Sequence, residues 1–149
     1  MVKGQTKKIT FNYLEGAFYI PSRTFLKKFI LELFREQGVQ VAEVNYIFCS
    51  DNYLLRINQD FLSHNTYTDI ITFQYNKVGE AVRSDIYISV DRVRDNATDF
   101  NVSFRKELYR VLFHGALHLC GYKDKTPKHA KKMRLMEDLY VGQYVSRET

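Results

Sequence analysis

Two histidines separated by three residues carry the first chemical signal in the sequence. His114 and His118 lie in a stretch with helical periodicity, where this spacing places both side chains on one face. A helix presents two imidazoles to one metal ion in this way. The pair alone is a weak indication, because two partly buried histidines with ordinary hydrogen bonds would have the same spacing.

The residues after His118 strengthen the metal hypothesis. Gly121 can end the helix by adopting a positive φ, which lets the chain turn back. Asp124 then points at the same ion, and carboxylate oxygens are ordinary zinc ligands. The spacing is that of the metzincin zinc site, in which the third ligand is a histidine. The sequence therefore predicts one Zn²⁺ per chain, bound by His114, His118 and Asp124.

One position departs from the protease pattern in a way that matters for chemistry. In metzincins a glutamate follows the first histidine and acts as the general base, whereas this chain has Gly115 there. Glycine carries no proton acceptor. The pattern thus predicts the scaffold of a zinc hydrolase, with a metzincin-like metal-site helix, but without the protease's base.

The elements that must position these residues form one α+β domain over residues 1–149, with a small mixed β-sheet packed against several helices. Alternating or β-branched segments predict the strands, and the last two of them form a hairpin. Capping residues and apolar periodicity predict the helices, with Phe61 of the second helix turned partly inward. The expected strands are Lys7–Tyr13, Val41–Cys49, Thr68–Tyr75 and Asp85–Val90. The expected helices run from Pro21-Ser22 to Gly38, from Tyr53 (capped by Asn52) to about Leu62, over Asp91–Phe100, from Ser103 to Cys120, and onward from Thr126-Pro127.

Composition excludes several classes of protein. The chain has 149 residues, of which 45% are hydrophobic and 26% charged, and this balance excludes intrinsic disorder. No uncharged apolar run is long enough to cross a membrane. The lysines of Met1–Thr10 precede no apolar run, so no secretory signal is expected, and two cysteines, Cys49 and Cys120, make no disulfide framework. We therefore expect a cytoplasmic protein, with a monomer as the favoured state.

The positive charge of the chain is concentrated after the metal motif. The segment Lys123–Arg134 holds six basic residues and one acidic residue, and so accounts for the whole formal net charge of +5. A local basic patch favours a phosphate-bearing partner, although a solvated helix face rich in lysine would have the same composition. The candidate RNA-binding residues are Lys123, Lys125, Lys128, Lys131 and Lys132.

The string from His114 to Tyr122, His-Gly-Ala-Leu-His-Leu-Cys-Gly-Tyr, resembles the signature of the YbeY family of metal-dependent endoribonucleases. The resemblance extends over about Val41 to Tyr140 in the family's order. It includes the elements Ile57-Asn58, Thr68–Phe73, Ser84–Ser89 and Asn96-Ala97, and also Met133 and Glu137 of the last helix. It implies a single-strand-specific endoribonuclease that acts on rRNA precursors, in small-subunit rRNA maturation and ribosome quality control.

Three positions differ from the family's usual pattern. Asp124 stands where the family usually has the third histidine ligand, and Lys123 stands where it has an aspartate. Leu62 stands where the family usually places an arginine that lines the cleft. Arg56 and the lysines around Asp124 are candidates to supply this positive charge instead.

In this interpretation the catalytic residues are His114, His118 and Asp69. The ion would polarise a phosphodiester oxygen and acidify its bound water, while the base is metal-bound hydroxide, a cleft carboxylate such as Asp69, or the RNA's own hydroxyl. Thr68 and Asp69 either line the cleft or form a turn that caps a strand. Asp85 either holds a histidine's second nitrogen or has a structural role, which we favour.

Two other classes of function remain open. The metzincin spacing favours a zinc peptidase, which Gly115 opposes. The second class is a non-catalytic RNA-binding or ribosome-assembly factor with a structural metal. The small number of protein ligands for the metal argues against this class. Structural zinc sites are usually closed by four protein ligands, and only three are apparent here.

Overall fold

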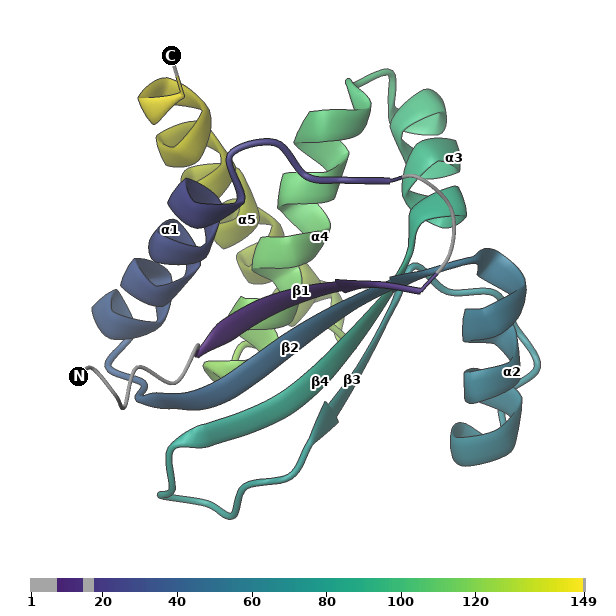
Figure 1. Cartoon of the computed structure of the whole chain (residues 1–149), viewed down its shortest axis with the longest axis horizontal. Helices are drawn as coiled ribbons and strands as arrows, with labels where there is room; N and C mark the ends of the chain where they lie inside the picture. Colours follow the sequence, from purple (N-terminus) through teal and green to yellow (C-terminus); the bar gives the residue numbers. More distant parts are fainter. Residues whose placement is uncertain (1–7, 15–17, 149) are drawn as a thin grey trace.

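The computed structural model describes residues 8–14 and 18–148 (Figure 1). Four strands form one sheet, and five helices surround it in this part of the chain. The strands are β1 (Ile9–Tyr13), β2 (Val41–Cys49), β3 (Ile70–Gln74) and β4 (Val82–Ser89). The helices are α1 (Arg23–Glu36), α2 (Asp51–Leu62), α3 (Val90–Phe100), α4 (Phe104–Leu119) and α5 (Pro127–Arg147).

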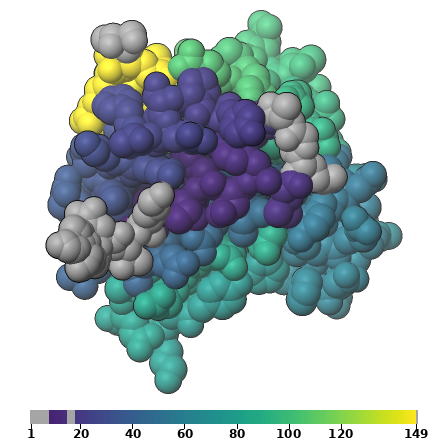
Figure 2. All heavy atoms as spheres, viewed as in Figure 1, coloured from purple at the N-terminus to yellow at the C-terminus, as the bar shows by residue number. Residues whose placement is uncertain are grey.

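The sheet is mixed, as the sequence predicts. Its order is β1-β2-β4-β3, with β1, β2 and β4 parallel and β3 antiparallel to β4. Helix α1 makes the crossover between the parallel strands β1 and β2, and the predicted hairpin joins β3 to β4. The turn of this hairpin protrudes from the molecule at the lower edge of Figure 2, and Val78 at its tip is fully exposed.

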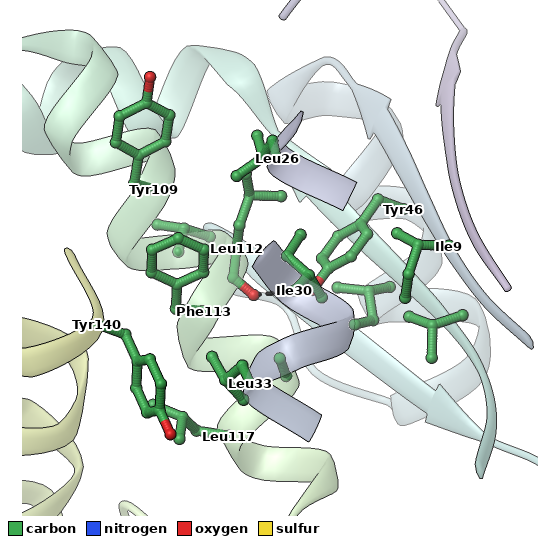
Figure 3. Close-up of a cluster of buried hydrophobic side chains, with 14 of the residues drawn as sticks. Ile9, Leu26, Ile30, Leu33, Tyr46, Tyr109, Leu112, Phe113, Leu117 and Tyr140 are labelled. Atoms are coloured by element: carbon green, nitrogen blue, oxygen red, sulfur yellow. Dashed lines mark hydrogen bonds between the residues drawn. The ribbon is translucent and has the colours of Figure 1, made fainter. Parts of the chain in front are cut away.

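Helices α1, α4 and α5 lie on one side of the sheet, where the main core is buried (Figures 1 and 3). The central contact joins the sheet to α4. Tyr46 of β2 is fully buried, and its hydroxyl donates to the carbonyl of Leu112 across 2.9 Å. Ile30, Leu33 and Phe113 pack around this bond. Helix α4 is therefore fixed against the sheet close to the turn that carries His114.

Helix α2 covers part of the other face of the sheet, and two predictions about it are wrong. Its N-cap is Ser50, whose hydroxyl accepts from the Tyr53 amide at 3.1 Å, so Asn52 lies inside the first turn. Phe61 is 71% exposed and makes a T-shaped ring contact with Phe73, because the inward stripe of α2 is narrow. The buried residues of that stripe are Leu54, Ile57 and Asn58, of which Leu54 and Ile57 pack on Cys49 and Ile71.

The ends of α4 and α5 follow local capping chemistry, as predicted. The Ser103 hydroxyl accepts from the Lys106 amide at the start of α4. The Thr126 hydroxyl accepts from the His129 amide at the start of α5, with Pro127 in its first turn. The Thr126 cap marks the C-terminal end of the loop that contains Asp124.

None of the described helices is long and apolar enough to span a membrane. Residues 1–7 lie outside the described residues. They include most of the segment Met1–Thr10, for which no secretory signal is expected, and Lys7 of the predicted first strand.

Candidate active site

The two histidines of α4 face one cavity of about 790 Å³. Helices α4 and α5, the start of β3 and the C-terminal ends of α2 and α3 form its walls. His114, His118 and Asp124 all line it, together with Asp69. The structure thus brings every candidate catalytic and metal-binding residue to the same space.

The loop after α4 turns at the predicted glycine. Gly121 has a φ of 102°, and its amide donates to the His118 carbonyl at 3.0 Å. The Tyr122 amide donates to the carbonyl of Leu117, which closes the end of the helix. This turn sends the chain back along α4 and places Asp124 Oδ2 at 3.2 Å from His114 Nε2.

His114 is held on its other side by Glu137 of α5. His114 Nδ1 lies 2.6 Å from Glu137 Oε2, and Glu137 is only 5% exposed. The sequence indicated no role for Glu137 beyond family resemblance. The one available signal was its position at helical spacing from Met133 and Tyr140, on the apolar face of the last helix, where a carboxylate needs a partner. That signal does not identify His114 as the partner.

The two contacts of His114 have an electrostatic consequence. A carboxylate only accepts hydrogen bonds, so Nδ1 carries the proton and a neutral ring presents a lone pair at Nε2. That lone pair would face the Asp124 carboxylate unless a proton or a cation lies between them. Burial lowers the pKa of His114, but Glu137, Asp124 and Asp69 outweigh it and raise the pKa overall. Either a second proton on His114 or a bound cation would remove the repulsion between the Nε2 lone pair and the Asp124 carboxylate.

His118 lies one turn further along α4 and is exposed. Its Nδ1 donates to the carbonyl of Tyr122 at 3.1 Å. In the neutral ring the lone pair is therefore on Nε2, the nitrogen that binds metal when Nδ1 donates to a carbonyl. Both histidines thus have their Nδ1 atoms occupied by acceptors.

The imidazole and carboxylate groups of His114, His118 and Asp124 are donors of the types that bind a divalent cation such as Zn²⁺. Two ligands of a tetrahedral zinc ion lie about 3.3–3.5 Å apart, and the His114–Asp124 pair lies at 3.2 Å. Within residues 8–14 and 18–148, no group of three His, Cys, Asp or Glu side chains converges closely enough to hold a metal. The pair is therefore formed, while binding by all three residues stays a prediction.

Gly115 is explained by the position of α4 on the sheet. A Cβ at this residue would lie 3.0 Å from Ile70 Cδ1 and 3.2 Å from Ile86 Cδ1. The residue faces the strands rather than the cavity, so a glutamate there could not act as a base in this fold. The missing protease glutamate is thus a consequence of close helix–sheet packing.

Asp69 and Thr68 line the cavity at the start of β3. Asp69 Oδ2 accepts from the Asn96 amide group at 3.3 Å, and its backbone carbonyl accepts from the Ser89 amide. Burial raises the pKa of Asp69, and the nearby His114 opposes this shift. Its location agrees with the prediction of a cleft residue, whereas its catalytic role stays a prediction.

Asp85 is not a histidine partner, and the favoured structural role is correct. It accepts hydrogen bonds from Asn45 and from the Tyr75 hydroxyl, each at 3.0 Å. Neighbouring residues of a strand face opposite sides, and Ile86 packs against α4. Asp85 therefore lies on the face of the sheet opposite the cavity.

Two arginines that were not among the candidate residues place positive charge in the lining of the cavity. Arg110 and Arg134 line it, as does Leu62, whereas Arg56 is absent from its lining. Arg110 donates to Glu137 Oε1 at 3.2 Å and to Asp138 Oδ1 at 2.8 Å. It therefore supports the carboxylate that holds His114.

The five candidate lysines are all exposed, but they do not share one location. Lys125 lines the cavity with His114. Lys123 and Lys132 line a second cavity on the other side of the loop. Lys128 and Lys131 line neither of these two cavities.

An α+β fold in which a histidine helix and several carboxylates share one cavity is typical of a hydrolase. A sequence model of the family described as "Endoribonuclease YbeY" matches residues 20–145. The chain belongs to the YbeY family.

Individual relatives support this assignment. The Endoribonuclease YbeY of Flavobacterium psychrophilum is 48% identical over 130 residues, which cover 87% of this chain and 91% of the relative. That of Porphyromonas gingivalis is 44% identical over 133 residues, covering 88% and 86%. The solution structure of TM1509 from Thermotoga maritima is similar with a TM-score of 0.63 and 30% identity, and covers 93% of this chain and 92% of that one.

Proposed function

We propose that this protein is a zinc-dependent endoribonuclease that cleaves single-stranded RNA during maturation of small-subunit rRNA and in ribosome quality control. Its substrates would be rRNA precursors in the cytoplasm, in association with the small ribosomal subunit. The observation that carries the proposal is His114, held between Glu137 and Asp124 in a cavity of a YbeY-family fold.

Six of the residues that line the cavity have a proposed role. His114, His118 and Asp124 would hold one Zn²⁺, which supplies Lewis acidity toward a phosphodiester oxygen and acidifies water. Glu137 fixes the tautomer and direction of His114 from its buried position. Asp69 faces the same space as a candidate proton acceptor, and Lys125 attracts the negatively charged strand.

The packing of Gly115 argues against the peptidase alternative. The position that holds the protease's base faces Ile70 and Ile86 and not the cavity. A peptide hydrolysis assay, with zinc added or chelated, tests this alternative directly. RNA binding without cleavage would instead favour the non-catalytic assembly factor.

The test of the proposal is cleavage of an end-labelled single-stranded RNA, with the same RNA in a duplex as the substrate control. We expect the wild type to cut only the single strand, a chelator to abolish cleavage, and zinc to restore it. His114→Ala and Asp124→Ala should each lower the rate by at least about 100-fold, because even outer-shell changes cost 10–100-fold.

A matched variant separates loss of the site from loss of charge. Asp99→Ala removes an exposed aspartate of α3 that does not line the cavity, and it should keep the wild-type rate and metal content. Full zinc in Asp124→Ala, at equal thermal stability, would reject Asp124 as a ligand. Undiminished cleavage by His114→Ala would reject the proposed site.

A further inference from the structure

A second cavity of about 410 Å³ lies on the other side of the loop between α4 and α5. Three of the residues that line it carry N–H donors on cationic or imidazole side chains: Lys123, His129 and Lys132. None of the described residues that line it is acidic. Such a lining favours an anion.

The loop and the first turns of α5 separate this cavity from the first one. Lys123 faces the second cavity, whereas Asp124 and Lys125 face the first. On α5, His129 and Lys132 line the second cavity, and Met133 and Arg134 line the first. The two cavities therefore share one wall, which also carries the Asp124 carboxylate.

The inner wall of the second cavity is built from side chains that hold one another in place. The Tyr122 hydroxyl donates to Gln37 Oε1 at 3.1 Å, and Gln37 Nε2 donates to the Tyr140 hydroxyl at 3.0 Å. Lys132 Nζ lies 5.8 Å from the centre of the Tyr122 ring, within the range of a cation–π contact. This contact holds the ammonium group of Lys132 beside the cavity.

The two cavities differ in charge. Four carboxylates (Asp69, Glu107, Asp124 and Glu137) and three cationic side chains (Arg110, Lys125 and Arg134) line the first one, whereas none of the described residues that line the second is acidic. The lining of the first cavity therefore attracts a phosphodiester strand less than that of the second, which favours the second for a flanking phosphate. The second cavity offers an anchor for that phosphate next to the first.

We infer that the second cavity is a phosphate-binding subsite for a nucleotide that flanks the cleavage point on the same single RNA strand. The inference rests on the proposed function and adds to it a location for the strand beyond the histidine cavity. Lys123 and Lys132 bind the phosphate, and His129 contributes a ring N–H. Lys128 and Lys131 take no part in this subsite.

The test compares two double variants with the same change in charge. Lys123→Gln/Lys132→Gln alters the subsite, and Lys28→Gln/Lys106→Gln is the matched control, made at two exposed lysines that line neither cavity. Binding of a labelled single-stranded RNA is followed by anisotropy over a salt series, with a chelator present so that the strand stays intact. KM and kcat for cleavage are then measured with zinc, and thermal melting confirms that both variants are folded.

We expect the subsite variant to weaken binding on the order of tenfold at low salt. Its slope of log affinity against log salt should become shallower by about 0.7 for each phosphate that the variant no longer binds. Its KM should rise while its kcat stays near that of the wild type, because the subsite does not touch the reacting phosphate. The control variant should resemble the wild type in all of these measurements.

Other outcomes would overturn the inference. Equal losses in the two double variants would mean that only net charge matters, and wild-type binding in the subsite variant would remove the subsite. Adenosine monophosphate, titrated by calorimetry, should bind far more weakly than the RNA; equal affinity would identify a free nucleotide as the ligand. A wild type that fails to bind single-stranded RNA would overturn the proposed function together with the inference.

Discussion

His114 and Glu137 lie 23 residues apart in the chain, yet the histidine Nδ1 and the buried carboxylate are separated by only 2.6 Å. Packing of α4 against α5 brings them together. Arg110, one turn before His114, binds the other oxygen of Glu137 at 3.2 Å. The histidine is therefore oriented by a partly buried ion pair and not only by its own helix.

This relationship predicts a loss of metal affinity in Glu137→Gln. The amide preserves the volume but removes the charge that orients and strengthens His114 as a ligand. Zinc affinity should fall by about 10–100-fold, as is typical for carboxylates that support a metal-binding histidine. Competition with a chromogenic chelator measures the change.

Glu148→Gln is the control for this variant, because Glu148 interacts with Arg105 and Tyr109, away from the cavity. It should bind zinc like the wild type. Equal zinc affinity of Glu137→Gln and the wild type would show that Glu137 has only a structural role.

Substitution of Gly115 should destabilise the protein without creating a base. A Cβ at this position would lie 3.0 Å from Ile70 Cδ1 and 3.2 Å from Ile86 Cδ1. Gly115→Ala should therefore lower the free energy of unfolding by about 1 kcal/mol, although alanine has a better helix propensity than glycine. Gly115→Glu should cost more than about 3 kcal/mol, because it buries a charge against the sheet. Urea denaturation measures both.

Gly142 of α5 offers a matched control, because a Cβ there meets no atom within 4 Å. Gly142→Ala should stabilise the protein by up to about 1 kcal/mol. A stable Gly115→Glu variant that hydrolyses peptides would contradict the explanation given for this glycine.

The sequence predicts the elements of the site well where the signals are local. Ser103, Gly121 and Thr126-Pro127 mark helix ends by their own backbone chemistry, and the structure confirms all three. The sequence predicts Asn52 as the cap of α2, whereas the path of the chain out of β2 makes Ser50 the cap.

Contacts between distant elements could not be predicted in this way. The bond from Glu137 to His114 depends on the packing of α4 against α5, which no local spacing encodes. The division of the lysines between two cavities depends in the same way on the turn of α5 after Thr126. The distribution of charge along the sequence located the basic segment but gave no indication that its charges face different spaces.

The buried hydroxyl of Tyr46 predicts a loss of stability at alkaline pH. Burial raises the pKa of Tyr46 far above its ordinary value of 10.0. Above pH 10 the unfolded chain therefore releases this proton while the folded chain retains it. The free energy of unfolding should fall by about 1.4 kcal/mol per pH unit from this residue, with no such effect below pH 10.

Tyr46→Phe isolates this effect. The variant should be less stable by about 1 kcal/mol at neutral pH, because it loses the bond to the Leu112 carbonyl. Its stability should then fall less steeply than that of the wild type above pH 10. Urea denaturation over a pH series measures the difference, and parallel alkaline limbs would show that Tyr46 ionises normally in the folded state.

The aspartate at the third proposed ligand position predicts how metal retention depends on pH. A carboxylate is already ionised near pH 5, whereas a histidine with an ordinary pKa of about 6.5 must lose a proton before it binds. Asp124→His should therefore lose zinc at higher pH than the wild type. Below about pH 6.5 its affinity should fall by roughly one further factor of ten per pH unit. Equilibrium dialysis at fixed free zinc, with metal content measured at each pH, gives both curves.

Asp99→His adds a histidine on α3, away from the cavity, and should leave the wild-type curve unchanged. Because the comparison uses metal content alone, it does not depend on whether RNA is cleaved. Superimposable curves for Asp124→His and the wild type, at equal stability, would show that residue 124 does not bind the ion.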